Sequence, residues 1–145
     1  MLIELMTLTA ILLLLNRRRS EAGDCEVYGQ PGFYFTWEEM TTTNQRRPNN
    51  PSGSQCTNLK RLASNILDPL REITGAPLYV TSAFRSRIVN DHTKGAVKNS
   101  LHLQGKAADV FSKKYNASEL KALVIQYGIP HGELIVYPDH LHVTL

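Results

Sequence analysis

The stretch Ser100-Leu-His102-Leu-Gln-Gly105-Lys-Ala-Ala-Asp109 places a histidine and an aspartate seven positions apart, with small residues between them. It predicts a loop at His102, a backbone turn at Gly105, and a following strand that carries Asp109. A histidine nitrogen and a carboxylate oxygen both bind zinc. A lone pair at this spacing is usually a loop histidine and a turn aspartate. The serine, glycine and alanines at fixed offsets favour two ligands of one metal instead.

A second segment, Asp139-His140-Leu141-His142, can supply a third ligand. His140 and His142 stand two positions apart, so on a strand both side chains point to the same face of the sheet. Taken alone, such a pair is more typical of an exposed edge strand. Together with His102 and Asp109, it predicts three protein ligands and an open fourth position, which is the pattern of a catalytic zinc site.

Two carboxylates are candidates for a general base. Asp139 precedes His142 by three positions, and a carboxylate beside an activated water can accept its proton. Asp139 is also the second residue of a Pro-Asp turn. In a regular strand it would point away from His140 and His142, so the role of base requires an irregular backbone there. Glu133 is the other candidate, although its position is more typical of a surface strand residue.

Arg85 lies in Thr81-Ser-Ala-Phe-Arg85-Ser86, directly after a predicted strand. An arginine there can stabilise an oxyanion or bind a substrate carboxylate with two parallel hydrogen bonds. A surface salt bridge is an equally good interpretation of this residue taken alone. His92 and His131 have no partner pattern, and we expect both to be exposed or to support the site from outside.

The rest of the chain predicts helices around a small sheet. Thr36-Trp-Glu-Glu39 is a capping-box pattern that starts a short helix. Apolar residues recur at helical spacing over residues 59–73, where Pro69 is expected to kink the helix and Gly75 to end it. Further helices are predicted for residues 86–92 and 116–127, loops for 45–55 and 93–99, and strands for 78–81, 106–111, 133–137 and 140–145, the last two forming a hairpin. The pattern indicates an α+β fold with a small antiparallel sheet and flanking helices.

Length and composition fit one globular domain. The chain has 145 residues, of which 42% are hydrophobic and 20% charged, an ordinary balance for a soluble fold. The formal net charge of +3 is mild, and the basic residues are not interleaved with aromatic ones. We therefore expect no nucleic-acid partner, and we expect a monomer.

The two cysteines, Cys25 and Cys56, do not have the C-x-x-C spacing of metal ligands. Two states remain open. In an exported domain they can form a disulfide, which stabilises the fold by about 3 to 4 kcal/mol in the chain-entropy model. In a cytosolic protein both are free thiols.

An apolar run over residues 5–15 precedes the arginine triplet 17–19. The run is shorter than the about 20 residues of a membrane span, and it follows Glu4 rather than the basic residues of a secretory signal. A short signal-anchor with the arginines on the cytoplasmic side, an atypical signal peptide and an amphipathic extension all remain open. We expect residues 1–25 to lie outside the fold as a hydrophobic leader or anchor. Contact of residues 1–19 with a membrane and the absence of any membrane role both remain open.

Three blocks of the sequence match a known family. The most specific block is Ser100-x-His102-x-x-Gly105-x-Ala107-x-Asp109 with the later His140-Leu-His142-Val. The first supporting block is Phe35-Thr-Trp-Glu-Glu-Met40 with Asn58-Leu-Lys60 and Leu67-Asp-Pro-Leu-Arg71. The second supporting block is Thr81-Ser-Ala-Phe-Arg85-Ser86 with Val89-Asn90. On these blocks, residues 34–145 resemble the zinc D-alanyl-D-alanine carboxypeptidase family, and more narrowly the small peptidoglycan peptidase domains of phages and prophages. The resemblance implies a hedgehog/DD-peptidase-like fold, with residues 26–145 forming the zinc peptidase domain.

The resemblance also implies roles for the site residues. Zinc would be held by His102, Asp109 and His142. Asp139 matches the catalytic base that the family places three positions before its last histidine. Arg85 matches an arginine that contacts the polarised carbonyl or the reaction intermediate, and so it also binds substrate.

Two further positions follow from the same resemblance. His140 matches the first histidine of the H-x-H form found in some members, with a supporting or transition-state role. Ser100 would position the His102 loop and contribute to substrate binding. Leu141 departs from the family, because many relatives have a tryptophan or another bulky residue before the last histidine.

The activity implied is zinc-dependent hydrolysis of peptide bonds in peptidoglycan stem peptides, as a D-Ala-D-Ala carboxypeptidase or an endopeptidase. The expected location is the cell envelope, the periplasm or a phage particle. The alternative is a binding module of the same fold that holds peptidoglycan or a virion partner without cutting it. A purely structural zinc site is disfavoured, because such sites are usually rich in cysteine and closed by four protein ligands.

Overall fold

The computed structural model describes residues 23–145. Residues 1–22, which include the predicted apolar run and arginine triplet, lie outside the described residues. Within residues 23–145, no helix combines the length and the apolar character needed to cross a bilayer. The predicted boundary at residue 25 falls inside the first described element, the 3-10 helix η1 (Gly23–Tyr28).

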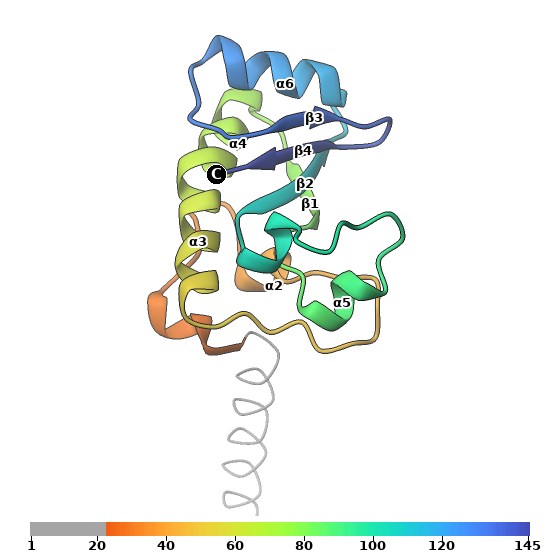
Figure 1. Cartoon of the computed structure of the whole chain (residues 1–145). Coiled ribbons are helices and arrows are strands. Elements are labelled where there is room, and N and C mark those ends of the chain that lie inside the picture. Colours follow the sequence, from red (N-terminus) through yellow and green to blue (C-terminus); the bar gives the residue numbers. More distant parts are fainter. Residues whose placement is uncertain (1–22) are drawn as a thin grey trace, which may run out of the picture.

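Four strands form one antiparallel sheet in the order β1-β2-β4-β3 (Figure 1). They are β1 (Leu78–Ser82), β2 (Ala107–Ser112), β3 (Leu134–Val136) and β4 (Leu141–Thr144). Each strand lies within one residue of its predicted bounds at both ends, and β3 and β4 form the predicted hairpin. The prediction of an α+β fold with a small antiparallel sheet is therefore confirmed.

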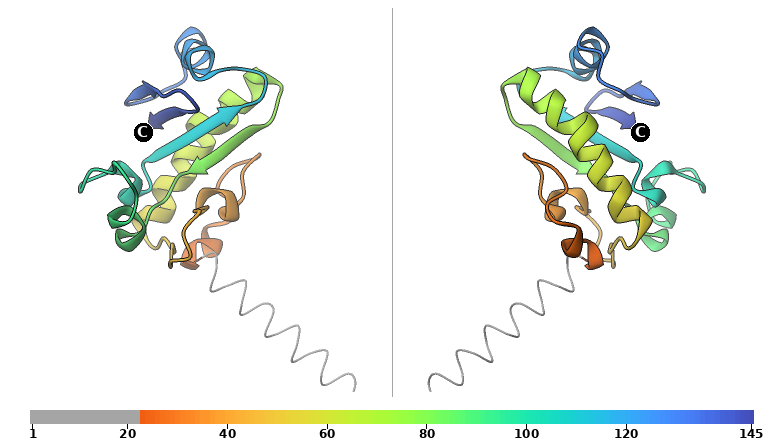
Figure 2. Two further views of the ribbon diagram at one scale, coloured as in Figure 1. Left: turned by 90° about the vertical axis from the view of Figure 1, so that its right-hand side faces the viewer. Right: turned by 90° about the vertical axis from the view of Figure 1, so that its left-hand side faces the viewer.

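A long helix covers one face of this sheet (Figure 2). It consists of α3 (Ser54–Leu62), the π-helical turn η2 (Ala63–Leu67) and α4 (Asp68–Thr74). In a regular α-helix, the ring of Pro69 would collide with the carbonyl four residues earlier. The wider π turn directly before Asp68 absorbs this conflict, so the helix continues through the proline instead of breaking. Gly75 then ends it with a φ of 59°, as predicted.

The shorter helices surround the sheet. They are η1, α2 (Trp37–Met40), α5 (Arg87–Asp91), η3 (Leu101–Gln104) and α6 (Ala117–Gln126). The predicted capping box starts α2, since the Thr36 side chain accepts from the backbone N–H of Glu39 and the Glu39 carboxylate accepts from that of Thr36. Helix α6 packs against α4 and the β3–β4 hairpin.

The disulfide between Cys25 and Cys56 ties η1 to the long helix. Both cysteines are fully buried and belong to the hydrophobic core. Of the two states left open by the sequence, the structure has the bridged one. Cys25 is therefore packed in the domain, although it is the last residue of the segment predicted to lie outside the fold.

The two faces of the sheet carry different kinds of side chain. Val110, Leu141 and Val143 point toward the long helix and are fully buried in the core. Because successive side chains of a strand point to opposite faces, Asp109 and His142 point to the other side. This second face is the one on which the polar residues gather.

Candidate metal centre

The strand register brings Asp109 and His142 together. Asp109 on β2 is paired with His142 on β4, and on the other side with Ser82 on β1. Side chains of directly paired residues lie on the same face of a sheet and close to each other. The register between β1 and β2 shifts at Thr81, which adds one residue just before the loop that carries Arg85. Two predicted ligands therefore become neighbours although 33 positions separate them in the chain.

His102 reaches the same place from η3, the short helix before β2. Ser100 caps this helix by accepting from the backbone N–H of His102, and Gly105 ends it with a φ of 70°. Only glycine fits here, because a Cβ on Gly105 would lie 2.6 Å from the backbone oxygen of Gln55. The loop is thus held closely against the long helix, and His102 is buried beneath the second face of the sheet.

The tautomer of His102 follows from its surroundings. Its Nδ1 lies 2.6 Å from the backbone oxygen of Ala83, which can only accept a hydrogen bond. The Nδ1–H therefore donates to Ala83, and the lone pair of Nε2 faces Asp109, with 3.4 Å between Nε2 and Asp109 Oδ1. A carbonyl that orients the non-binding nitrogen is the usual support of a histidine metal ligand.

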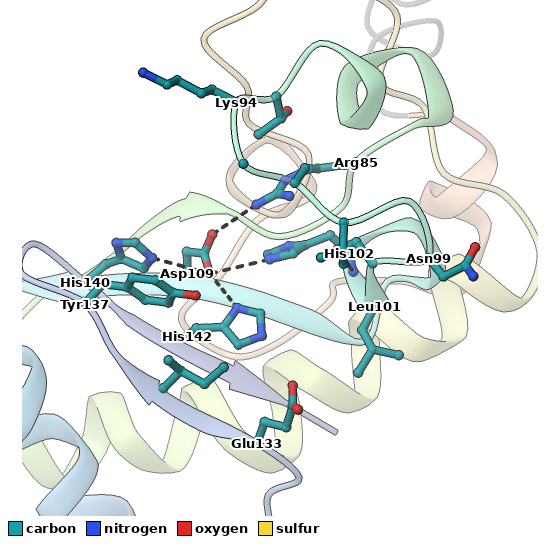
Figure 3. A pocket seen from close by; sticks show the side chains of 16 residues that line it. Arg85, Lys94, Asn99, Leu101, His102, Asp109, Glu133, Tyr137, His140 and His142 are labelled. Carbon is teal, nitrogen blue, oxygen red and sulfur yellow. Dashed lines mark hydrogen bonds and ion pairs between the residues drawn. The ribbon is translucent and has the colours of Figure 1, made fainter.

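The donor set of His102, Asp109 and His142 fits a zinc ion. Their ligand atoms lie within 4.8 Å of one another, and His142 Nδ1 is 2.8 Å from Asp109 Oδ1 (Figure 3). Two imidazole nitrogens and one carboxylate oxygen are zinc ligands, and a three-residue set leaves one position of a tetrahedron open. Sequence and structure agree on which three residues are brought together.

Arg85 is fixed beside this cluster by three side chains. Its Nη2 donates to Asp109 Oδ2 at 3.2 Å, its Nε to Ser82 Oγ at 3.0 Å, and its Nη1 to Asn90 Oδ1 at 3.4 Å. Its backbone N–H donates to the carbonyl of His102, which ties the two loops together. Burial lowers the pKa of the guanidinium, and the charge of Asp109 opposes that effect. One oxygen of Asp109 thus faces the arginine, and the other faces the histidines.

The charge of Asp109 is set by two opposing influences. Burial raises the pKa of its carboxyl, but the hydrogen bonds and charges of His102 and His142 outweigh burial and hold that pKa well below its usual value. The surroundings of Asp109 therefore favour its anionic form, which is the form that binds a metal.

His140 faces the cluster, whereas Asp139 does not. His140 Nε2 lies 3.8 Å from Asp109 Oδ1, and its ring stacks on Tyr137 with 4.6 Å between ring centres. Its Nδ1 is 2.7 Å from Asp139 Oδ1. The side chain of Asp139 is 85% exposed, and its hydrogen bond to His140 lowers the pKa of its carboxyl. The structure therefore places Asp139 behind His140, outside the cavity.

A cavity of about 690 Å³ opens over the cluster. Figure 3 shows Arg85 and Lys94 on one side of Asp109 and Glu133 on the other. The predicted loop 93–99 forms much of the wall. The lining residues are Arg85, Thr93, Lys94, Gly95, Ala96, Val97, Asn99, Ser100, Leu101, His102, Asp109, Glu133, Ile135, Tyr137, His140 and His142.

Several of these positions were not predicted from the sequence. Ile135 and Tyr137 join Glu133 in the wall because alternate side chains of a strand face the same way, and that period of two was the available signal. Leu101 gave none. The predicted loop 45–55 does not line this cavity but contributes to a neighbouring hollow, together with His92. His131 is exposed and its ring bonds only to the backbone of Gly132 within the described residues.

A model of the family described as Peptidase M15 matches residues 31–144. The chain belongs to the peptidase M15 family. This is the zinc D-Ala-D-Ala carboxypeptidase type that the sequence resembles, so the resemblance is confirmed. Family membership makes the protein a metallopeptidase, and the ligand atoms of His102, Asp109 and His142 lie close enough together to bind a metal ion. No curated protein matches the chain.

Proposed function

We propose that the protein is a zinc metallopeptidase that hydrolyses peptide bonds in peptidoglycan stem peptides, as a D-Ala-D-Ala carboxypeptidase or an endopeptidase. The observation that carries the proposal is the meeting of His102, Asp109 and His142 at the floor of one cavity. The match to the M15 family supports the class of enzyme, and the resemblance of the sequence blocks supports the substrate and the hedgehog/DD-peptidase-like fold.

His102 Nε2, Asp109 Oδ1 and His142 Nδ1 would hold the ion. When bound, zinc supplies Lewis acidity, which activates water and polarises the carbonyl of a substrate. Asp109 contributes a negative charge that Arg85 keeps in place through Oδ2. Ser100 fixes the loop that carries His102 and also lines the cavity.

Proton transfer is assigned to the imidazole of His140, with Asp139 as its hydrogen-bond partner. His140 is the one of the two that reaches the cavity, and Asp139 holds its Nδ1 at 2.7 Å. A carboxylate in that position selects the tautomer of the ring and stabilises its charged form. In this arrangement His140 Nε2 accepts the proton of the attacking water and returns it to the leaving amine. The resemblance assigns the base to Asp139 itself, and both assignments require Asp139.

Arg85 bonds to Asp109 and can also bind the substrate. Its five N–H groups exceed its three protein partners, so two N–H groups remain for an oxyanion or a carboxylate in the cavity. A guanidinium already fixed in position loses little further freedom when it binds, which is the condition for effective stabilisation of a developing charge.

The disulfide supports a location outside the reducing cytoplasm. Structural disulfides persist in exported and periplasmic proteins and are rare in the cytosol. The Cys25–Cys56 bridge joins two elements of the core, so it belongs to the folded domain. We place the enzyme in the cell envelope or on a phage particle, where its proposed substrate is found.

Zinc content and cleavage test the proposal together. The full-length protein is loaded with zinc, its bound metal is measured, and purified muropeptides are digested in parallel with Asp139→Ala and His102→Ala variants. We expect one equivalent of zinc and release of a stem-peptide fragment in the unmodified protein, and no stoichiometric zinc in His102→Ala. One equivalent of zinc without cleavage of any stem peptide would exclude the enzyme and favour a non-catalytic binding module.

A further inference from the structure

Two more hollows continue from the metal cavity. The first has a volume of about 390 Å³ and shares Arg85, Thr93 and Lys94 with the metal cavity. The second, of about 410 Å³, shares Gln45 and His92 with the first. We call these two hollows the side groove. Its walls come from residues 42–47 and from the segment around α5, so it leads from the metal centre to the surface loop of residues 42–47.

The side groove is strongly cationic. Arg46, Arg47, Arg85 and Lys94 line it, and among the described residues its lining contains no aspartate or glutamate. Arg85 is paired with Asp109, whereas the other three cations form no ion pair within residues 23–145. Threonine hydroxyls and side-chain amides make up most of the remaining lining. Such a surface is suited to an anionic, hydrogen-bonding ligand.

The wall formed by residues 42–47 is fixed to the body of the domain. Gln45 Nε2 donates to the backbone oxygen of Val89 at 3.0 Å and to Thr93 Oγ1 at 3.1 Å. Asn49 accepts from the backbone N–H of Ser86 at 2.7 Å, next to Arg85. The groove is therefore preformed, which reduces the entropy lost when a ligand binds.

One polar atom inside the groove wall has its acceptor capacity unused. Gln45 Oε1 is buried and has no hydrogen-bond partner among the described residues. The amide cannot be turned around, because the carbonyl of Val89 requires the N–H side of Gln45. Oε1 has almost no accessible surface, so it lies inside the groove wall and is not itself a contact for a ligand. The charge of Arg46, Arg47, Arg85 and Lys94 is therefore the property of the groove that a peptide carboxylate would recognise.

We propose that the side groove binds the carboxylate-bearing part of the stem peptide whose scissile carbonyl lies at the metal centre. The assignment rests on the proposed function and adds to it a subsite that selects acidic substrates. Continuity through Arg85 and Lys94 is the reason to place both contacts on one peptide chain. Arg46 and Arg47 are the residues that recognise the carboxylate, and they act by binding without touching the reacting atoms.

Steady-state kinetics of the full-length protein test the subsite. Two stem peptides are compared that differ only in whether the free carboxylate of the glutamyl residue is present or converted to a carboxamide. We expect Arg46→Ala/Arg47→Ala to raise KM for the acidic peptide about tenfold, the loss expected for one or two exposed charge-assisted contacts, with kcat changed by less than about twofold. KM for the amidated peptide should stay unchanged, and Arg46→Lys/Arg47→Lys should restore part of the difference.

A matched control removes the same amount of charge elsewhere. Lys113 and Lys114 contact the rings of Tyr79 and Tyr115 and do not line the groove. Lys113→Ala/Lys114→Ala should leave both KM values unchanged. Equal KM values in the two double variants would overturn the proposal, and so would equal KM values for the acidic and amidated peptides in the unmodified protein. The acidic peptide can also be displaced by poly(glycerol phosphate) and by free glutamate peptides. If the phosphate polymer acted at the lower concentration, the groove would be a binding site for that polymer, and the proposal would be overturned.

Binding to the metal-stripped protein separates this inference from the proposed function. Equilibrium titration of the acidic peptide needs no cleavage, and it should lose about tenfold in affinity in the arginine double variant. Binding that depends on Arg46 and Arg47, with no cleavage after zinc is restored, would reject the peptidase and retain the groove. Cleavage that is indifferent to both arginines would retain the peptidase and reject the groove.

Discussion

The metal cluster and the turn that follows Tyr137 lie side by side on one sheet, but they are held in very different ways. Asp109 is bonded by Arg85 on one oxygen and faces three histidine rings with the other. Asp139, on the turn, has 85% of its side chain in solvent, and within residues 23–145 its side-chain partner is His140. Each proposed metal ligand is fixed by strand register, burial or a backbone hydrogen bond, whereas Asp139 is held mainly by its contact to His140.

This difference suits the two tasks. A metal site needs fixed donors, because ligand geometry and the orientation of each ring determine affinity. A group that carries a proton between water and a leaving amine has to change partners during a turnover. The buried cluster has the first property and the exposed turn has the second, as the proposed roles of the two regions require. Substitutions in the two regions should therefore separate metal binding from catalysis.

The largest effect is expected at Asp109. Asp109→Asn keeps the shape of the side chain but removes the charge that pairs with Arg85 and that we propose holds the metal. We expect loss of stoichiometric zinc and a fall in kcat/KM of about 10³-fold or more, the scale of removing an essential catalytic group. Metal analysis and muropeptide digestion measure the two effects. Asp139→Asn is the control from the turn and should retain one equivalent of zinc; full zinc in Asp109→Asn would mean that the cluster is not the metal site.

A smaller effect is expected at Arg85, which bonds to Asp109 and also lines the cavity. Arg85→Lys keeps the charge but loses the fork that bonds Ser82, Asn90 and Asp109 at once. At saturating zinc we expect kcat to fall roughly 10²-fold, as for loss of an oxyanion donor, and zinc affinity to fall about tenfold. Arg61→Lys, on the exposed side of α3, is the matched control. A loss of zinc affinity with kcat unchanged would restrict Arg85 to orienting Asp109.

Much of this site could be predicted from the sequence, because close spacing and small residues leave few alternatives. Gly105 is needed where the His102 loop meets the long helix, and the strand period places Asp109 and His142 on one face. Those local rules indicate His102, Asp109 and the segment that supplies the third ligand, whereas the choice of His142 within that segment is what the family resemblance implies. The side-chain direction of Asp139 cannot be predicted in this way, since it depends on how the four-residue turn 137–140 leaves β3 and enters β4.

The side groove shows the other limit of sequence-based prediction. Arg46 and Arg47 read as part of a polar surface loop, and nothing local connects them to Arg85, which lies about forty positions later. Their position along the same groove depends on Gln45 and Asn49, whose side chains bond to backbone groups of a distant segment. The π turn before Pro69 is a similar case, because the sequence signals a conflict there but not how the helix resolves it.

A third prediction concerns the turn itself. In Asp139→Asn and His140→Gln, kcat should fall by roughly 10²-fold each while zinc is retained, since a general base contributes on that scale. Glu133→Gln should change kcat by less than about threefold. The double variant Asp139→Asn/His140→Gln should be little worse than either single variant, because residues that act as one unit are not additive. A large loss in Glu133→Gln alone would move the base to the opposite wall of the cavity.

The smallest effect is expected at Ser100, which supports the cluster without touching the metal. Ser100→Ala removes the cap of η3, and the N–H of His102 then loses its acceptor. We expect zinc affinity to fall about tenfold, because the ring of His102 is less well oriented, and the free energy of unfolding to fall by about 1 kcal/mol. Thr36→Ala removes a cap of the same kind at α2, away from the site, and should cost similar stability with zinc affinity unchanged. Equal zinc affinities in the two variants would show that the cluster is held by Ala83, Arg85 and the strand register alone, and that the serine at the start of the ligand motif serves only the local fold.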